Sequence, residues 1–249
     1  MARRQAKGAR RQAGDIPAEA SLGRLAGAVG GHLPGRRIAS AMLAAPGALE
    51  AALAGAVSAP VYPMFLADGW FTTSALPRRL SAAGAPKARI LPPFGRDAHV
   101  QALAGRLAAG AAAERGWGER ETVLILAAHG SGRSSRPAIA ARETARRIAA
   151  AHRFADIRLG FVEEYPGIAE AAAHAGTRAV CLPLFAAAGG HVAGDVPEAL
   201  DGAEFAGARL APLGLAGEAP AMIARTLASA LASAPAGAAA IDPAPARPV

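Results

Sequence analysis

The chain has 249 residues, 52% of them hydrophobic, and a formal charge of +8 from 27 basic and 19 acidic side chains. This size and apolar content suffice for one α/β domain or two smaller lobes with a buried core. Five positive charges lie within the first eleven residues, so the rest of the chain is nearly balanced. Because no interleaved aromatic residues, zinc-ligand spacing or recognition-helix pattern accompanies them, the composition argues against a nucleic-acid-binding protein.

The remaining global features predict a cytoplasmic protein with no membrane partner. The longest uncharged stretch, residues 51–67, contains Pro60 and Pro63 and is too short for a bilayer span. The basic N-terminus lacks the apolar segment of a secretory signal. Cys181 is the single cysteine, which excludes internal disulfides, and the apolar run AVCLPLF around it predicts a buried structural thiol.

Segments of the first half recur 120 residues later. The stretch APGALEAAL, with Pro46, returns as YPGIAEAAA, with Pro166. The stretch YPMFLADGWFTTSALPRRL returns as LPLFAAAGGHVAGDVPEAL, and this match pairs prolines and a phenylalanine, which an alanine-rich composition does not produce by chance. We therefore predict a tandem duplication.

The duplication defines four predicted regions. Residues 1–14 are expected to be a disordered basic arm and residues 234–249 a disordered tail. Residues 15–115 form a first repeat and residues 120–233 a second repeat. The basic stretch ARRQAKGAR stands where the first repeat should have its first strand and cannot form a buried one. The first repeat is therefore predicted to lack that strand, unless the coding region starts further upstream.

The better preserved second repeat alternates strands and helices. Apolar runs predict strands, and segments opened by Pro or ended by Gly predict helices. This alternation predicts an α/β fold in which each lobe is a flavodoxin-like parallel sheet flanked by helices, with strand order 2-1-3. The predicted strands are residues 122–128, 157–162, 178–185 and about 208–212, and the predicted helices are residues 137–151, 167–174, 195–202 and 220–233.

Three residues with metal-binding side chains follow three successive strands of the second repeat. They are His129, Glu163 and His191. In the order 2-1-3 the strand before His129 lies between the other two, so the three side chains should converge at the carboxyl edge of the sheet. Two imidazoles and a carboxylate suit Co²⁺, Fe²⁺, Ni²⁺ or Zn²⁺ and leave positions open for ligand exchange. Beside His191, Gly189 and Gly190 allow close backbone approach.

The chain resembles a known family in the stretches AAHGSG, GFVEEYPGIAEA and LPLFAAAGGHVAGDVPEAL. These are similar to signature stretches of the sirohydrochlorin chelatases, cobalt- or iron-inserting lyases of cobalamin and siroheme biosynthesis with the class II chelatase fold. The resemblance covers residues 17–215. It implies two chelatase-like lobes, a tetrapyrrole substrate in the cleft between them, and metal insertion without a nucleotide. The family's metal-binding histidines fall on His129 and His191, and its acidic partner falls on Glu163.

Two arginines and the first repeat complete the predicted site. Arg133 and Arg136, in the loop after His129, either pair with carboxylates of the substrate or are solvated charges of a first helical turn. In the first repeat, Ala9, Leu43 and Phe71 occupy the positions of the three ligands. Only one metal site is therefore expected.

Two other enzyme classes do not fit the sequence, and one non-enzymatic function remains as an alternative. A histidine phosphatase needs an arginine immediately before the histidine, where Ala128 stands, and an α/β-hydrolase needs a G-x-S-x-G elbow that the chain lacks. A non-catalytic metal or tetrapyrrole carrier with a degenerate first lobe remains an alternative. The choice of metal and the oligomeric state do not follow from the sequence.

Overall fold

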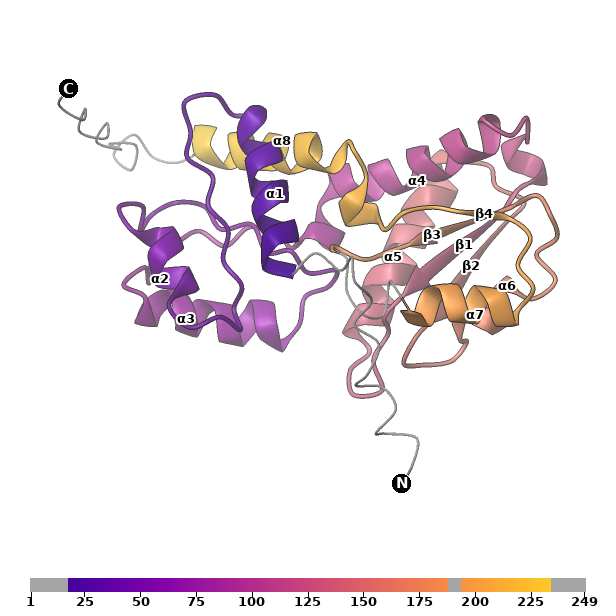
Figure 1. Cartoon of the computed structure of the whole chain (residues 1–249), viewed down its shortest axis with the longest axis horizontal. Coiled ribbons are helices and arrows are strands. Elements are labelled where there is room, and N and C mark those ends of the chain that lie inside the picture. Colours follow the sequence, from indigo (N-terminus) through magenta and orange to yellow (C-terminus); the bar gives the residue numbers. More distant parts are fainter. Residues whose placement is uncertain (1–17, 188–193, 234–249) are drawn as a thin grey trace.

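The computed structural model describes residues 18–187 and 194–233, which form two regions side by side (Figure 1). Helices α1 to α3 gather in one region, and the sheet with helices α5 to α7 forms the other. The helices are α1 (Ala18–Gly31), α2 (Ala48–Leu53), α3 (Leu76–Ala82), α4 (Ala98–Ala113), α5 (Arg136–Ala151), α6 (Ile168–Ala172), α7 (Val196–Gly202) and α8 (Ala219–Ala232), and the strands are β1 (Val123–Ala128), β2 (Asp156–Phe161), β3 (Ala179–Pro183) and β4 (Ala208–Arg209).

The sheet has four parallel strands in the order β2-β1-β3-β4. The α/β class and the central place of β1 are therefore as predicted, and every predicted element of the second repeat is present with ends shifted by a few residues. Side chains alternate across β1, so that Leu124 and Leu126 pack in one core cluster while Ile125 and Ala127 pack in another. Both faces are covered, which is why the strand is an uninterrupted apolar run.

The packing of helices α4 and α8 does not follow the predicted boundaries of the repeats. Helix α4 ends the first repeat in sequence, but it lies against β3 and α5 of the second. Helix α8 ends the second repeat, but it lies beside α1 (Figure 1). A single core cluster consequently joins Val29 and Phe94 of the first half to Leu124 of β1. The limits 15–115 and 120–233 stay a prediction about sequence, because the largest core cluster crosses them, although each stretch also has a smaller cluster of its own.

The first half differs from the expectation of a full parallel sheet in each lobe. Within residues 18–121 its strand pairing consists of one parallel bridge, between Val61 and Ile90. The N–H of Val61 donates to the carbonyl oxygen of Arg89, and the N–H of Leu91 donates to that of Val61. Prolines at positions 60, 63, 92 and 93 flank the bridge on both segments. Because proline has no N–H to donate, Pro63 cannot supply the next hydrogen bond of the ladder on the carboxyl side of the bridge.

The sequence also predicted a buried cysteine and no membrane-spanning segment. Cys181 is fully buried in β3, and burial raises the pKa of its thiol to about 12, as expected for a structural cysteine. In the part of the chain that the structure describes, no helix is both long and apolar enough to cross a bilayer. The predicted arm (1–14), tail (234–249) and His191 lie outside the described residues.

Candidate metal site at the carboxyl edge of the sheet

His129 is the first residue after β1, at the carboxyl edge of the sheet. Its carbonyl oxygen accepts the N–H of Glu163 at 3.0 Å and that of Val162 at 3.2 Å, so the ends of the central strand and of β2 are held together. This pairing brings Glu163 beside His129. The distance between His129 Nδ1 and Glu163 Oε2 is 3.9 Å, and the two side chains are 41% and 50% exposed.

The surroundings of the imidazole favour one tautomer. His129 Nδ1 lies 3.1 Å from the carbonyl oxygen of Gly130 and also faces the Glu163 carboxylate. The Gly130 carbonyl accepts hydrogen bonds, so the proton belongs on Nδ1, and Nε2 carries the lone pair that a metal ion needs. The Glu163 oxygen, at 3.9 Å, is too far away to accept a hydrogen bond from the ring. Histidine ligands in proteins are commonly oriented in this way, through a hydrogen bond from the nitrogen that does not bind the metal.

Gly130 explains why a glycine follows the histidine. Its φ of 68° lies in the left-handed region. A Cβ at this position would lie 2.8 Å from Glu164 Cγ and 3.0 Å from Phe161 Cβ, so the turn after His129 packs directly on the end of β2. The adjacent carboxylates thus have different surroundings. Glu163 is half exposed beside His129, whereas Glu164 Oε1 is buried and has no hydrogen-bond partner among the described residues.

The complete ligand set stays a prediction. His129 and Glu163 lie together, but His191 falls outside the described residues, in the interval 188–193. Within residues 18–187 and 194–233 no group of three His, Cys, Asp or Glu side chains is arranged to hold a metal. A third ligand for this pair must therefore come from the undescribed residues, from water or from the substrate.

Arg133 extends into solvent from the loop between His129 and α5, and Arg136 from the first position of α5. Both residues are exposed. Their backbone N–H groups donate to the hydroxyls of Ser131 and Ser134, at 3.2 and 3.3 Å, which shapes the loop without engaging the guanidinium groups. Neither guanidinium forms an ion pair with the described part of the chain. Both are available for an anionic ligand.

An aromatic turn in the first half was not predicted as functional, since Phe71 counted only as the loss of a ligand. Trp70 and Phe71 are 61% and 54% exposed, and Phe71 stacks on Phe65 with 5.8 Å between ring centroids. The signal was present in the sequence as two adjacent aromatic residues in the stretch ADGWF, between a strand-like segment and a helix.

Comparisons with known proteins agree with this geometry. A family model described as CbiX matches residues 123–231. A solved structure titled as that of CbiX, the terminal enzyme for biosynthesis of siroheme in denitrifying bacteria, has 48% sequence identity to the chain and a TM-score of 0.79. The match covers 88% of this chain and 95% of that one. No curated protein matches the chain.

More distant matches include structures of SirB from Bacillus subtilis. The structure with Fe³⁺ has 14% identity and a TM-score of 0.66, and covers 88% of this chain and 94% of that one. The structure of the sirohydrochlorin chelatase SirB from the subspecies spizizenii with cobalt has 12% identity and a TM-score of 0.62, and covers 88% and 91%. At this identity the likeness concerns the fold alone.

Proposed function

The chain belongs to the CbiX family, and we propose that it inserts a divalent metal ion, cobalt or iron, into a sirohydrochlorin-type tetrapyrrole. The reaction is that of a lyase and consumes no nucleotide. The observation that carries the proposal is the pairing of His129 and Glu163 at the ends of two hydrogen-bonded strands, with 3.9 Å between their side chains.

In the proposed mechanism the metal is a substrate that the protein holds before transfer. Nε2 of His129 and the carboxylate of Glu163 bind the ion, and His191 is the predicted third ligand. The carboxylate offsets part of the double positive charge, and the partly exposed position of both side chains leaves room for exchangeable ligands. Imidazole and carboxylate bind borderline divalent ions without fixing a unique geometry, which suits a metal that has to leave again.

Transfer then exchanges protein ligands for ring nitrogens. The macrocycle forms bonds from its nitrogens to the ion, loses two protons, and becomes the metallated product. As the bonds to the ion break, His129 Nε2 and Glu163 regain basic lone pairs and accept those protons. An imidazole suits this step because its usual pKa lies near neutral pH, so it releases the proton to water afterwards.

The carrier alternative predicts metal binding without turnover. It rested on the degenerate first half, but the first half contributes α4 to the core of the sheet and is not a dispensable lobe. The relative with 48% identity is named as an enzyme. Both observations support catalysis.

An anaerobic insertion assay tests the proposal. Sirohydrochlorin and Co²⁺ or Fe²⁺ are mixed with the protein, and the metallated product is followed by absorbance. We expect His129→Ala and His191→Ala each to slow insertion by about 100-fold or more, because each removes a metal ligand. Glu163→Gln keeps the size of the side chain but removes its charge, so insertion should slow with little change in folding.

Two matched variants serve as controls. His32→Ala removes an exposed histidine in the first half, and Glu164→Gln alters the carboxylate next to Glu163. The first should leave the rate unchanged, and the second should matter less than Glu163→Gln. Wild-type protein that binds Co²⁺ but yields no product would select the carrier. An unchanged cobalt titration in both histidine variants would overturn the metal site.

A further inference from the structure

The aromatic turn, defined as Phe65, Trp70 and Phe71, matches in sequence, at an offset of 120 residues, the segment of the second half that contains His191. Pro63 and Phe65 match Pro183 and Phe185 in sequence. Each segment also accepts an equivalent hydrogen bond. The N–H of Gly95 donates to the carbonyl oxygen of Phe65, and the N–H of Gly214 donates to that of Phe185. The turn therefore stands at the carboxyl edge of its half.

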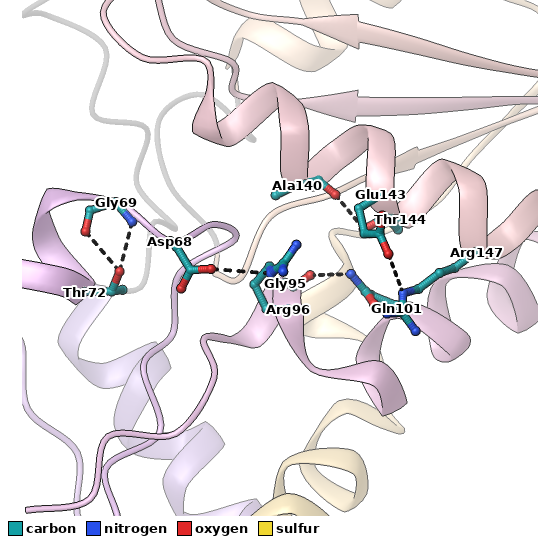
Figure 2. Close-up of polar contacts among 10 residues, drawn as sticks. All are labelled: Asp68, Gly69, Thr72, Gly95, Arg96, Gln101, Ala140, Glu143, Thr144 and Arg147. Carbon is teal, nitrogen blue, oxygen red and sulfur yellow. Dashed lines mark hydrogen bonds and ion pairs between the residues drawn. The ribbon is translucent and has the colours of Figure 1, made fainter.

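The aromatic rings are fixed in position. Phe65 and Phe71 stack with an angle of 10° between their planes, and Trp70 meets Phe71 edge-on at 5.3 Å with an angle of 75°. The backbone beneath them is held by Thr72, whose hydroxyl accepts the N–H of Gly69 at 2.9 Å and donates to its carbonyl at 3.1 Å (Figure 2). These contacts orient the exposed rings before any ligand arrives.

The aromatic turn lies on the side of the first half that faces the sheet region. Asp68, two residues before Trp70, forms an ion pair of 3.4 Å with Arg96 (Figure 2). Arg96 ends the 3₁₀ turn Phe94–Arg96, which packs against α5. Helix α5 begins seven residues after His129. A short series of contacts thus connects the aromatic turn to the helix that follows the candidate metal ligand.

The positive charges of nearby arginines indicate what kind of ligand would bind to the aromatic turn. The guanidinium of Arg78 lies 6.0 Å from the centre of the Trp70 ring, and Arg96 is 41% exposed. Arg133, on the loop after His129, and Arg136, at the start of α5, are also exposed. A flat, conjugated ring bearing several carboxylates matches both features, because aromatic rings stack on its face and guanidinium groups pair with its periphery.

Exposed aromatic rings that lie next to one another are informative, whereas single exposed apolar residues are common on protein surfaces. Two adjacent large apolar side chains that are both more than half exposed are a typical feature of a binding surface. At the equivalent position the second half has a predicted metal ligand. A site that holds the metal from one side and the organic ring from the other needs different side chains in its two halves.

We infer that the aromatic turn is the surface on which the first half binds the face of the tetrapyrrole, with Arg78 pairing with a peripheral carboxylate. This inference rests on the proposed function and extends it to the substrate-binding role of the first half. Trp70 and Phe71 contact the macrocycle without binding the metal. Phe71 matches His191 in sequence, so the first half has no metal ligand at this position, and the phenylalanine there instead increases the affinity for the tetrapyrrole.

Equilibrium binding of metal-free sirohydrochlorin, followed anaerobically by its absorbance change, tests the inference without turnover. Trp70→Ala and Phe71→Ala should each raise the Kd about tenfold, in line with the loss of one stacked ring. Trp70→Phe should recover part of the affinity. Arg78→Gln should weaken binding more at low than at high salt, because a carboxylate pair is screened. Cobalt affinity should stay at the wild-type value in all four.

A control and the separate outcomes complete the design. Val57→Ala removes an apolar side chain of similar exposure, 52%, that precedes the Val61–Ile90 bridge and so lies at the opposite edge. It should leave binding unchanged. Wild-type affinity in Trp70→Ala and Phe71→Ala, with insertion by wild type intact, would overturn the inference alone. Wild-type protein that neither binds nor metallates sirohydrochlorin would overturn both proposals, and binding without insertion would overturn only the proposed function.

Discussion

The two halves share one backbone feature, a corner before a long helix. The corner is the 3₁₀ turn Phe94–Arg96 before α4 in the first half and Leu213–Leu215 before α8 in the second. In each, a glycine N–H donates to a phenylalanine carbonyl, Gly95 to Phe65 at 3.0 Å and Gly214 to Phe185 at 2.9 Å. Each glycine stands in a 3₁₀ turn, and a Cβ on it would collide with the backbone carbonyl of Leu66 or Ala186. A shared corner of this kind is the structural counterpart of the sequence repeat.

The edges beside these corners differ. The second half presents His129 and Glu163 from paired strands, whereas the first half has a single parallel bridge and presents Trp70 and Phe71. The comparison shows which features resist change. A backbone contact with no room for a Cβ admits only glycine, while exposed side chains at a sheet edge change freely with the chemistry they perform.

The strongest test of the shared corner is to add the missing Cβ in each half. Gly95→Ala and Gly214→Ala should each lower the free energy of unfolding by about 3 kcal/mol, because the obstructing atoms are backbone and cannot rotate away. Urea unfolding at neutral pH measures the change. Similar losses would mean that both corners carry equal strain, and a loss in only one would show that the halves have diverged in packing as well as in chemistry.

Gly110→Ala is the matched control for these two variants. Gly110 is exposed within α4, and a Cβ there would meet no atom within 4 Å. Alanine has the higher helix propensity, so this variant should gain about 0.5–1 kcal/mol. A loss at Gly110 comparable with that at Gly214 would contradict the packing argument.

A hydrogen-bond cluster at the start of α4, which has no counterpart at the start of α8, should give a smaller effect. The buried carboxylate of Asp97, the N-cap of α4, accepts from Tyr62 at 2.8 Å, Thr226 at 2.5 Å and the His99 N–H at 2.9 Å. Burial, with Asp97 nearby, raises the pKa of Tyr62 above its ordinary value. At the start of α8, by contrast, Glu218 makes no side-chain cap.

Tyr62→Phe should therefore cost about 1–2 kcal/mol of unfolding free energy, since the Asp97 carboxylate loses one donor while keeping two. Chemical denaturation measures it, with Tyr165→Phe as control because Tyr165 is 83% exposed. An effect no larger than that of the control would mean that the hydrogen bond from Tyr62 to Asp97 adds nothing measurable to stability.

The smallest expected effect lies at the junction between the halves. Hydrogen bonds from His152 and the Arg153 N–H lower the pKa of Glu119 below its ordinary value. A carboxyl group with a lowered pKa stabilises the folded state above its unfolded pKa of about 4.3, and this stabilisation is lost as pH falls through the folded pKa. Because Glu119 is 32% exposed, solvent limits the contribution.

Glu119→Gln should destabilise the protein by less than about 1 kcal/mol at pH 7, and the difference from wild type should shrink as the pH falls from 7 toward 3. Unfolding by urea at the two pH values measures it. Glu114→Gln, an exposed neighbour at the end of α4, should show no such difference. A Glu119 effect that grows toward low pH would have the wrong sign for this arrangement.

Only those parts of the candidate site that depend on local sequence pattern could be predicted from the sequence. The apolar run before His129 predicted a central strand, and that strand end does bring His129 beside Glu163. The adjacent carboxylates of Glu163 and Glu164 have different surroundings, because the first is half exposed and the second has a buried oxygen. The proposed role of Trp70 and Phe71 could not be predicted from the sequence. The repeat matches Phe71 with His191, and this match indicates only that the first half lacks a metal ligand there.

The α/β alternation and the residues at the carboxyl ends of the second-half strands follow from the amino-acid sequence, because they depend on apolar period, glycine and proline within a few residues. The packing of α4 and α8 across the two halves, and the largest core cluster that joins the halves, depend on contacts between residues far apart in sequence. An alanine-rich helix has a weakly differentiated apolar face, so its own sequence does not specify which surface it covers. That choice is made by the shape of the sheet and corners it meets.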